Sequence, residues 1–132
     1  MGIDAEFYVK PTAGFDRDAY ARLELWCSDP ARTIAFYRLS VDCDNPPMIG
    51  IWLLDRYYGP GYERGPWPEL RAFGDELAVH VGETAEVFCS GDHVDSEDSE
   101  PWATARAENE EHWQRVGHLP YRNHFGMGCD CP

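Results

Sequence analysis

The period of the hydrophobic residues changes once along this chain of 132 residues, and that change limits the folds open to it. In the first half, apolar side chains alternate with polar ones or form short runs, both typical of β-strands. From Pro68 onward, apolar residues recur at Leu70, Phe73, Leu77 and Val81, the spacing of one α-helical stripe. Strands followed by helices in a short chain favour an α+β domain.

Five segments have the composition and spacing of β-strands. They are residues 3–10, 21–27, 33–41, 48–54 and 85–90. The first two alternate apolar with polar side chains, whereas residues 48–54 form an apolar run that suits a strand inside a sheet. Turn-forming residues separate the first four segments at short intervals, which predicts an antiparallel meander.

Two helices are expected on one face of this sheet. The first begins at Pro68, whose missing N–H costs nothing in a first turn, and ends before Gly82. The second runs from an N-cap at Ser99 to about Val116 and ends at Gly117. Its buried stripe is expected to be Trp102, Ala105, Trp113 and Val116, with Glu108, Glu110, Glu111 and Arg115 facing outward.

The predicted architecture is therefore one α+β domain over residues 1–132. It has a mostly antiparallel sheet of about five strands with two helices packed on one face. Residues 118–132 have no clear period and are expected to form an irregular tail.

Acidic side chains far outnumber basic ones. The chain has 24 Asp and Glu against 11 Lys and Arg, a net charge of −13, and the charge is −3 over residues 1–56, −4 over 57–91 and −6 over 92–132. Such a charge repels nucleic acid and anionic membranes and favours a basic partner. An acidic surface that serves solubility alone is the other interpretation.

Neither a membrane span nor a secretory leader is indicated. No apolar run approaches the ~20 residues that a spanning helix needs. The first ten residues lack a basic region followed by an apolar one. We therefore expect a cytoplasmic protein whose five cysteines are reduced thiols.

The segment "YYGPGYERGPWPEL", residues 57–70, concentrates aromatic side chains on irregular backbone. Its glycines permit unusual backbone angles and its prolines restrict theirs, which predicts a rigid, shaped loop. In one interpretation its aromatic rings only cover the end of the sheet. In the other they form a binding surface, with Tyr58, Tyr62, Arg64 and Trp67 as anchors and Glu63 beside them to orient a ligand.

This loop, with the later strand "AEVFCSGD" (85–92), resembles a family of small bacterial proteins of unknown activity. Members share a Tyr-Gly-Pro-Gly-Tyr-x-Arg-Gly-x-Trp-Pro segment and a following Val-x-Tyr-Gly-Gly-Asp-like strand, and the likeness covers about residues 50 to 95. The second motif differs here, because Phe88-Cys89-Ser90-Gly91-Asp92 has no tyrosine. The resemblance implies no activity and marks four positions: Tyr62, Arg64, Trp67 and Asp92.

Histidine and cysteine accumulate near the C-terminus. Four of them are weak candidates for zinc ligands: His118, His124, Cys129 and Cys131. The Cys-x-Cys pair and the wide histidine spacing differ from the usual zinc arrangements, so surface residues on a tail are the preferred interpretation. No metal site is predicted.

The segment "GDHVDSEDSE", residues 91–100, has the character of a solvated acidic loop. Its carboxylates are Asp92, Asp95, Glu97, Asp98 and Glu100, and they lack the register of a calcium-binding loop. A nucleophilic pair of Cys89 with His93 is conceivable, but a cysteine on a strand is more typical of core packing. The chain has no Gly-x-Ser-x-Gly motif either. No catalytic residue and no cofactor are predicted.

These features together predict a non-catalytic, acidic interaction module for a basic protein partner, comparable to an immunity protein or a phage-type inhibitor. The acidic loop would attract the partner and the aromatic loop would bind it. Two alternatives stay open. One is a small enzyme or ligand-binding domain with a cleft where the 57–67 loop meets Asp92. The other is a zinc-stabilised structural domain.

Overall fold

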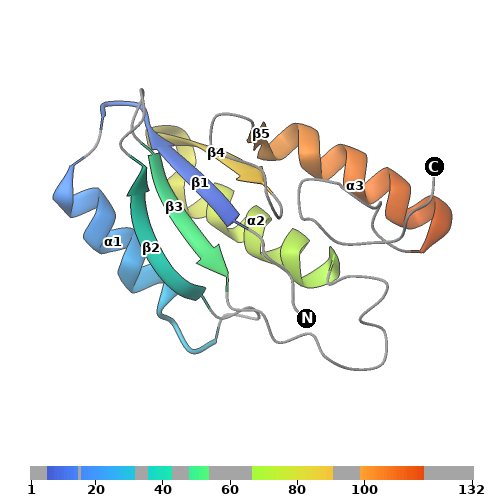
Figure 1. The fold of residues 1–132 in the computed structure, drawn as a ribbon, viewed down its shortest axis with the longest axis horizontal. Coiled ribbons are helices and arrows are strands. Elements are labelled where there is room, and N and C mark those ends of the chain that lie inside the picture. The colour runs from blue at the N-terminus through green and yellow to red at the C-terminus, as the bar shows by residue number, and fades with distance from the viewer. Residues whose placement is uncertain are drawn as a thin grey trace.

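A computed structural model describes residues 6–14, 16–31, 36–42, 48–53, 67–90 and 99–117 (Figure 1). The elements in chain order are β1 (Glu6–Pro11), α1 (Arg17–Cys27), β2 (Phe36–Asp42), β3 (Met48–Leu53), α2 (Trp67–Val81), the 3₁₀ turn η2 (Gly82–Thr84), β4 (Ala85–Ser90), β5 (Glu100–Pro101) and α3 (Trp102–Val116). The described strands form one antiparallel sheet, and the predicted α+β class is confirmed.

The sheet has the strand order β2-β3-β1-β4-β5, so the first strand lies in its middle. Phe7 of β1 is opposite Ile51 on one side and Cys89 on the other, and all three side chains are buried. A meander would have placed β1 at an edge, so that prediction is wrong. The physical reason is that Tyr8 is buried as well as Phe7, and a strand buried on both faces belongs inside a sheet.

The segment predicted as the second strand is a helix. Asp16 caps α1, because its Oδ1 accepts a hydrogen bond from the backbone N–H of Ala19 at 2.7 Å. Leu23 and Cys27, four residues apart, are buried, whereas Leu25 is 75% exposed. The alternation of Leu23, Leu25 and Cys27 predicted a strand. In the structure only Leu23 and Cys27, which share one face of the helix, reach the core.

The other helices begin and end close to their predicted limits. α2 begins one residue earlier than expected, at Trp67, and ends before Gly82, which has a φ of 55°. α3 begins later than expected, and its N-cap position is Pro101 rather than Ser99. Residues Glu100–Pro101 pair with β4 instead, so the helix cannot start before them. Gly117 ends α3 with a φ of 80°, as predicted.

All three described helices pack on the same face of the sheet, so the predicted count of two is corrected to three. Figure 1 shows α1 and α2 behind the strands, with α3 beside them. The centre of this layer is aromatic. Phe7 lies 5.2 Å from both Phe73 of α2 and Trp102 of α3, and Trp67 lies 5.9 Å from Trp102, measured between ring centroids.

The buried face of α3 differs from the predicted one in its second half. Trp102 and Ala105 are buried as expected, and Trp113 is half-buried against the core, but the fully buried stripe continues through Asn109 and His112. Val116 is 39% exposed. The spacing of these four residues, 3, 4 and 3, is helical throughout. The sequence pattern did not reveal it because Asn109 and His112 are polar. Asn109 is accommodated because its Nδ2 donates to the carbonyl of Ala105 at 2.7 Å.

Candidate functional site

Most of the residues predicted to form a site lie outside the described part of the chain. These are Tyr58, Tyr62, Glu63, Arg64, Asp92, Asp95, Glu97 and Asp98, together with the weak metal candidates His118, His124, Cys129 and Cys131. The aromatic loop, the cleft beside Asp92 and the C-terminal tail therefore stay predictions. Trp67 and Glu100 are described, and both are bound into the fold.

Trp67 belongs to the core. Its side chain has no exposed surface, and its indole N–H donates to Oε2 of Glu110 at 2.6 Å. A ring in this position is not available to a partner, so Trp67 supports the start of α2 from inside. Glu100 is half-buried in β5, where it is opposite Cys89 of β4.

The bond to Trp67 is part of a polar contact between α2 and α3. Arg71 donates to both carboxylate oxygens of Glu110, at 2.8 and 2.9 Å. The hydrogen bond from Trp67, with those from Gln114 and Arg71, holds the pKa of Glu110 below its usual range. Glu110 was predicted to face outward, and no pattern in the sequence signals that a tryptophan 43 residues away binds it.

Two further ion pairs involve the other arginines of this layer. Arg106 donates to Asp75 across the α2–α3 contact at 2.7 Å, and Arg115 donates to Glu111 within α3 at 3.2 Å. Residues 67–90 and 99–117 contain nine carboxylates and three arginines, a net charge of −6. Every one of these three arginines is thus paired with a carboxylate of the same layer.

At least three carboxylates in residues 67–90 and 99–117 take part in no contact with the arginines. No hydrogen bond or ion pair with another described residue engages Glu69, Glu83 or Glu108. Glu83 and Glu108 are exposed, and Glu69 is partly exposed in the first turn of α2. These three side chains, one each on α2, η2 and α3, are together called the acidic surface below.

Cys89 is a packing residue, as predicted. Its side chain is fully buried between β1 and β5, and burial raises the pKa of its thiol far above the usual range. A thiol that stays protonated is a poor nucleophile. Among the described residues, no three or more histidine, cysteine or acidic side chains gather where they could hold a metal ion.

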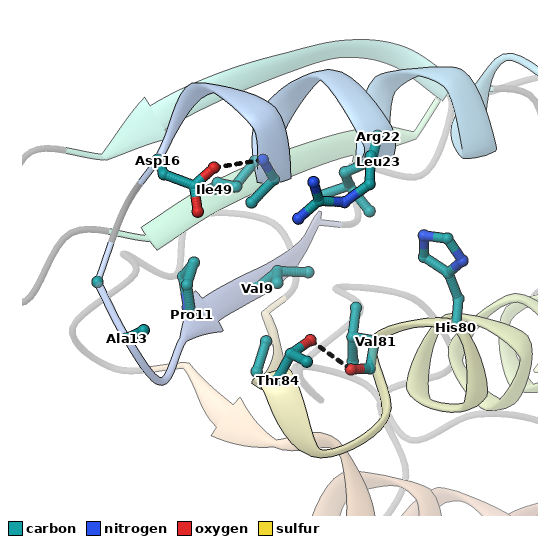
Figure 2. Close-up of a pocket in the computed structure, with 13 residues that line it drawn as sticks. Val9, Pro11, Ala13, Asp16, Arg22, Leu23, Ile49, His80, Val81 and Thr84 are labelled. Carbon is teal, nitrogen blue, oxygen red and sulfur yellow. Dashed lines mark hydrogen bonds between the residues drawn. The ribbon is translucent and has the colours of Figure 1, made fainter.

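A pocket of about 490 Å³ lies where α1, the end of β1 and the α2–η2 junction meet (Figure 2). Its floor is apolar and comes from five elements, β1, α1, β3, α2 and β4. The main contributors are Val9, Leu23, Ile49, Val81 and Ala85. The turn after β1 forms one wall and is fixed by a hydrogen bond from the N–H of Thr12 to the carbonyl of Thr84, at 2.9 Å.

Polar groups at this pocket come from two helices. Figure 2 shows the Arg22 guanidinium over Val9 on the α1 side and the His80 ring on the α2 side. His80 is stacked on Trp26, with ring centroids 5.1 Å apart and planes at 21°. Asp16 lines the pocket as well, but one of its oxygens caps α1. Sequence reasoning missed this site, because it placed Arg22 on a strand.

No protein-family model, curated protein or solved structure matches this chain. Within the described ranges, no helix is long and apolar enough to cross a membrane.

Proposed function

We propose that this protein is a non-catalytic, acidic interaction module that binds a basic protein partner. The observation that carries the proposal is the charge of residues 67–90 and 99–117, which form α2, η2, β4, β5 and α3. Their three arginines are already paired within the molecule, while Glu69, Glu83 and Glu108 are engaged by no described residue. The net charge of −6 over residues 67–90 and 99–117 therefore attracts positively charged groups from outside the molecule.

The sign of this field selects the class of partner. Carboxylates repel the phosphates of nucleic acids and of anionic lipids, and they attract lysine- and arginine-rich surfaces. Complementary charge accelerates encounter, and short-range contacts then determine how long the complex lasts. Immunity proteins and phage-type inhibitors are classes that use this chemistry. For the short-range contacts, the aromatic side chains of residues 57–66 are the candidates.

The experiment compares two variants of equal net charge. The first carries Glu69→Gln, Glu83→Gln and Glu108→Gln on the acidic surface. The matched control removes three carboxylates from α1 and its C-terminal turn, through Asp18→Asn, Glu24→Gln and Asp29→Asn. A basic protein captured from the native host is then used in surface-based kinetics at several salt concentrations.

The acidic-surface variant should associate about tenfold more slowly at low salt, with a flatter salt dependence and a nearly unchanged dissociation rate. The control should associate close to the wild-type rate. Equal behaviour of the two variants, or association that does not depend on salt, would refute the proposal. Trp67→Ala is no test of the interface, because loss of this buried ring would destabilise the fold itself.

The zinc alternative can be tested separately. Its four candidate ligands lie outside the described residues. We expect purified protein to contain no stoichiometric zinc and to keep its unfolding midpoint when a chelator is added, since a structural zinc ion would contribute folding free energy outright. One equivalent of zinc by elemental analysis would contradict this expectation.

A further inference from the structure

The pocket between α1, β1 and η2 combines an apolar floor with a guanidinium and an imidazole at its mouth. Its volume of about 490 Å³ is within the range of small-molecule sites, roughly 300–1,000 Å³. Such sites are mostly apolar and carry a few polar groups that orient the ligand. Val9, Leu23 and Ile49 supply the apolar part here, and Arg22 and His80 supply the polar part.

Arg22 has the properties of a ligand-binding group. No hydrogen bond or ion pair with another described residue engages its guanidinium. In the α2–α3 layer, by contrast, all three arginines are paired. Figure 2 shows this guanidinium turned over the pocket floor rather than away from it. A planar guanidinium binds a carboxylate through two parallel hydrogen bonds.

The other polar groups agree with an anionic ligand. His80 is held at the mouth by its stacking on Trp26, which places a polar ring beside the Arg22 side of the pocket. The hydroxyl of Thr84 donates to the carbonyl of Val81 at 2.6 Å, so this proton is not offered to a ligand. Asp16 is the one acidic side chain among the lining residues described, and it is engaged as the N-cap of α1.

We propose that this pocket is a binding site for a small apolar monocarboxylate. The carboxylate would bind the Arg22 guanidinium beside His80, and the apolar tail would cover Val9, Leu23 and Ile49. The site uses α1, β1 and the end of α2, and it includes none of the three residues of the acidic surface. It is therefore independent of the interaction proposed above.

The test uses three probes with one tail and different head groups: phenylpropionate, phenylpropanol and phenylpropylamine. Each is titrated into ¹⁵N-labelled full-length protein, and the amide shifts of α1, β1 and η2 are followed by NMR. Phenylpropionate should bind most tightly and shift amides around the pocket. Equal affinity for the three probes, tighter binding of the amine, or no binding of the acid would overturn the proposal.

Two variants assign the roles of charge and volume. Arg22→Gln should weaken phenylpropionate about tenfold or more, because it removes a charge-assisted hydrogen bond, and should leave phenylpropanol unchanged. Arg17→Gln is the matched control, since Arg17 lies on the same helix, is exposed and does not line the pocket. Ala19 of α1 also lines the pocket, so Ala19→Leu should fill it and abolish binding of all probes. Circular dichroism checks the fold of each variant.

The two proposals fail in different ways. The variant with Glu69, Glu83 and Glu108 neutralised should bind phenylpropionate as the wild type does. If Arg22→Gln and Arg17→Gln bind the acid equally, the carboxylate site is refuted while the acidic interaction is untouched. If the acidic surface proves irrelevant to association, the probe titrations still decide on the pocket.

Discussion

Replacing Gly74 by alanine should destabilise this protein, although alanine is the better helix former. A Cβ built at Gly74 would lie 2.5 Å from Cε2 and 2.7 Å from Cη2 of Trp102, whereas carbon atoms in contact are separated by about 3.5–4.0 Å. The indole has little freedom to move aside. Its N–H donates to Asp75 at 3.1 Å, and its ring packs on Phe7 and Trp67.

The size of the effect follows from two opposing terms. Alanine in the middle of a helix gains about 1 kcal/mol over glycine. Forcing an extra methyl group into a packed core costs about 1–3 kcal/mol, and a displacement of roughly 1 Å at a fixed ring belongs at the upper end. The free energy of unfolding of Gly74→Ala should therefore fall by about 2 kcal/mol. The melting temperature should fall by about 6–10 °C for a domain of this size.

Urea unfolding, followed by tryptophan fluorescence and circular dichroism, measures this difference. Ala107→Gly, at an exposed position of α3, gives the helix propensity alone and should cost about 1 kcal/mol. In a Trp102→Leu background the obstacle is gone, so Gly74→Ala should become neutral or stabilising. The packing argument is refuted if Gly74→Ala is as stable as the wild type, or if its effect is the same in both backgrounds.

Three other predictions concern single side chains of the described core. Glu110→Ala should lower the free energy of unfolding by about 1–3 kcal/mol, measured in urea, because the buried indole N–H of Trp67 and the guanidinium of Arg71 lose their acceptor. In the folded protein the pKa of Glu110 lies below its unfolded value of about 4.3. The contribution of ionised Glu110 to the free energy of unfolding is therefore complete above about pH 4.3 and is lost as the pH falls through the folded pKa. Between about pH 5 and 3 the wild type should therefore lose more stability than Glu110→Gln, and parallel curves from acid-dependent melts would contradict this. Finally, iodoacetamide should leave Cys89 unmodified in native protein and alkylate it in urea, as peptide mass spectrometry would show.

The elements with a strong, uninterrupted period could be predicted from sequence. The stripe from Leu70 to Val81 gave α2 within one residue, and the short apolar run of residues 85–90 matches β4. Both predictions rest on a local hydrophobic pattern, and the tertiary contacts of α2 and β4 agree with that pattern. The buried positions Asn109 and His112 of α3 could not be predicted from the hydrophobic pattern, because both residues are polar. A polar residue in a core can be recognised only from its hydrogen-bond partner, which the sequence does not show.

α1 shows how a short pattern can satisfy two structures at once. In seven residues, alternation suits a strand, while Leu23 and Cys27 also suit one helical face. The cap at Asp16 decides between them, and it lies five residues before the apolar pattern begins. This one error also concealed the pocket, because Arg22 reaches the pocket floor only from a helix.

The candidate site could not be assembled from sequence for a geometric reason. Its floor joins Val9, Leu23, Ile49 and Val81, which are separated by at least 14 residues along the chain. No spacing rule connects such positions, since their proximity is a result of the strand order.

The central position of β1 has a consequence for the order in which the protein can fold during synthesis. One neighbour, β3, is complete at residue 53, but the other, β4, is complete only at residue 90. At about 5–20 residues per second, the edge of β1 that receives β4 waits roughly 4–16 s after β1 itself has been synthesised. During that interval Phe7 and Val9 belong to an open sheet edge of the kind that pairs with other chains. Among the described strands, β1 is thus enclosed on both sides long after its own synthesis, and the nascent chain depends on β4 to end that exposure.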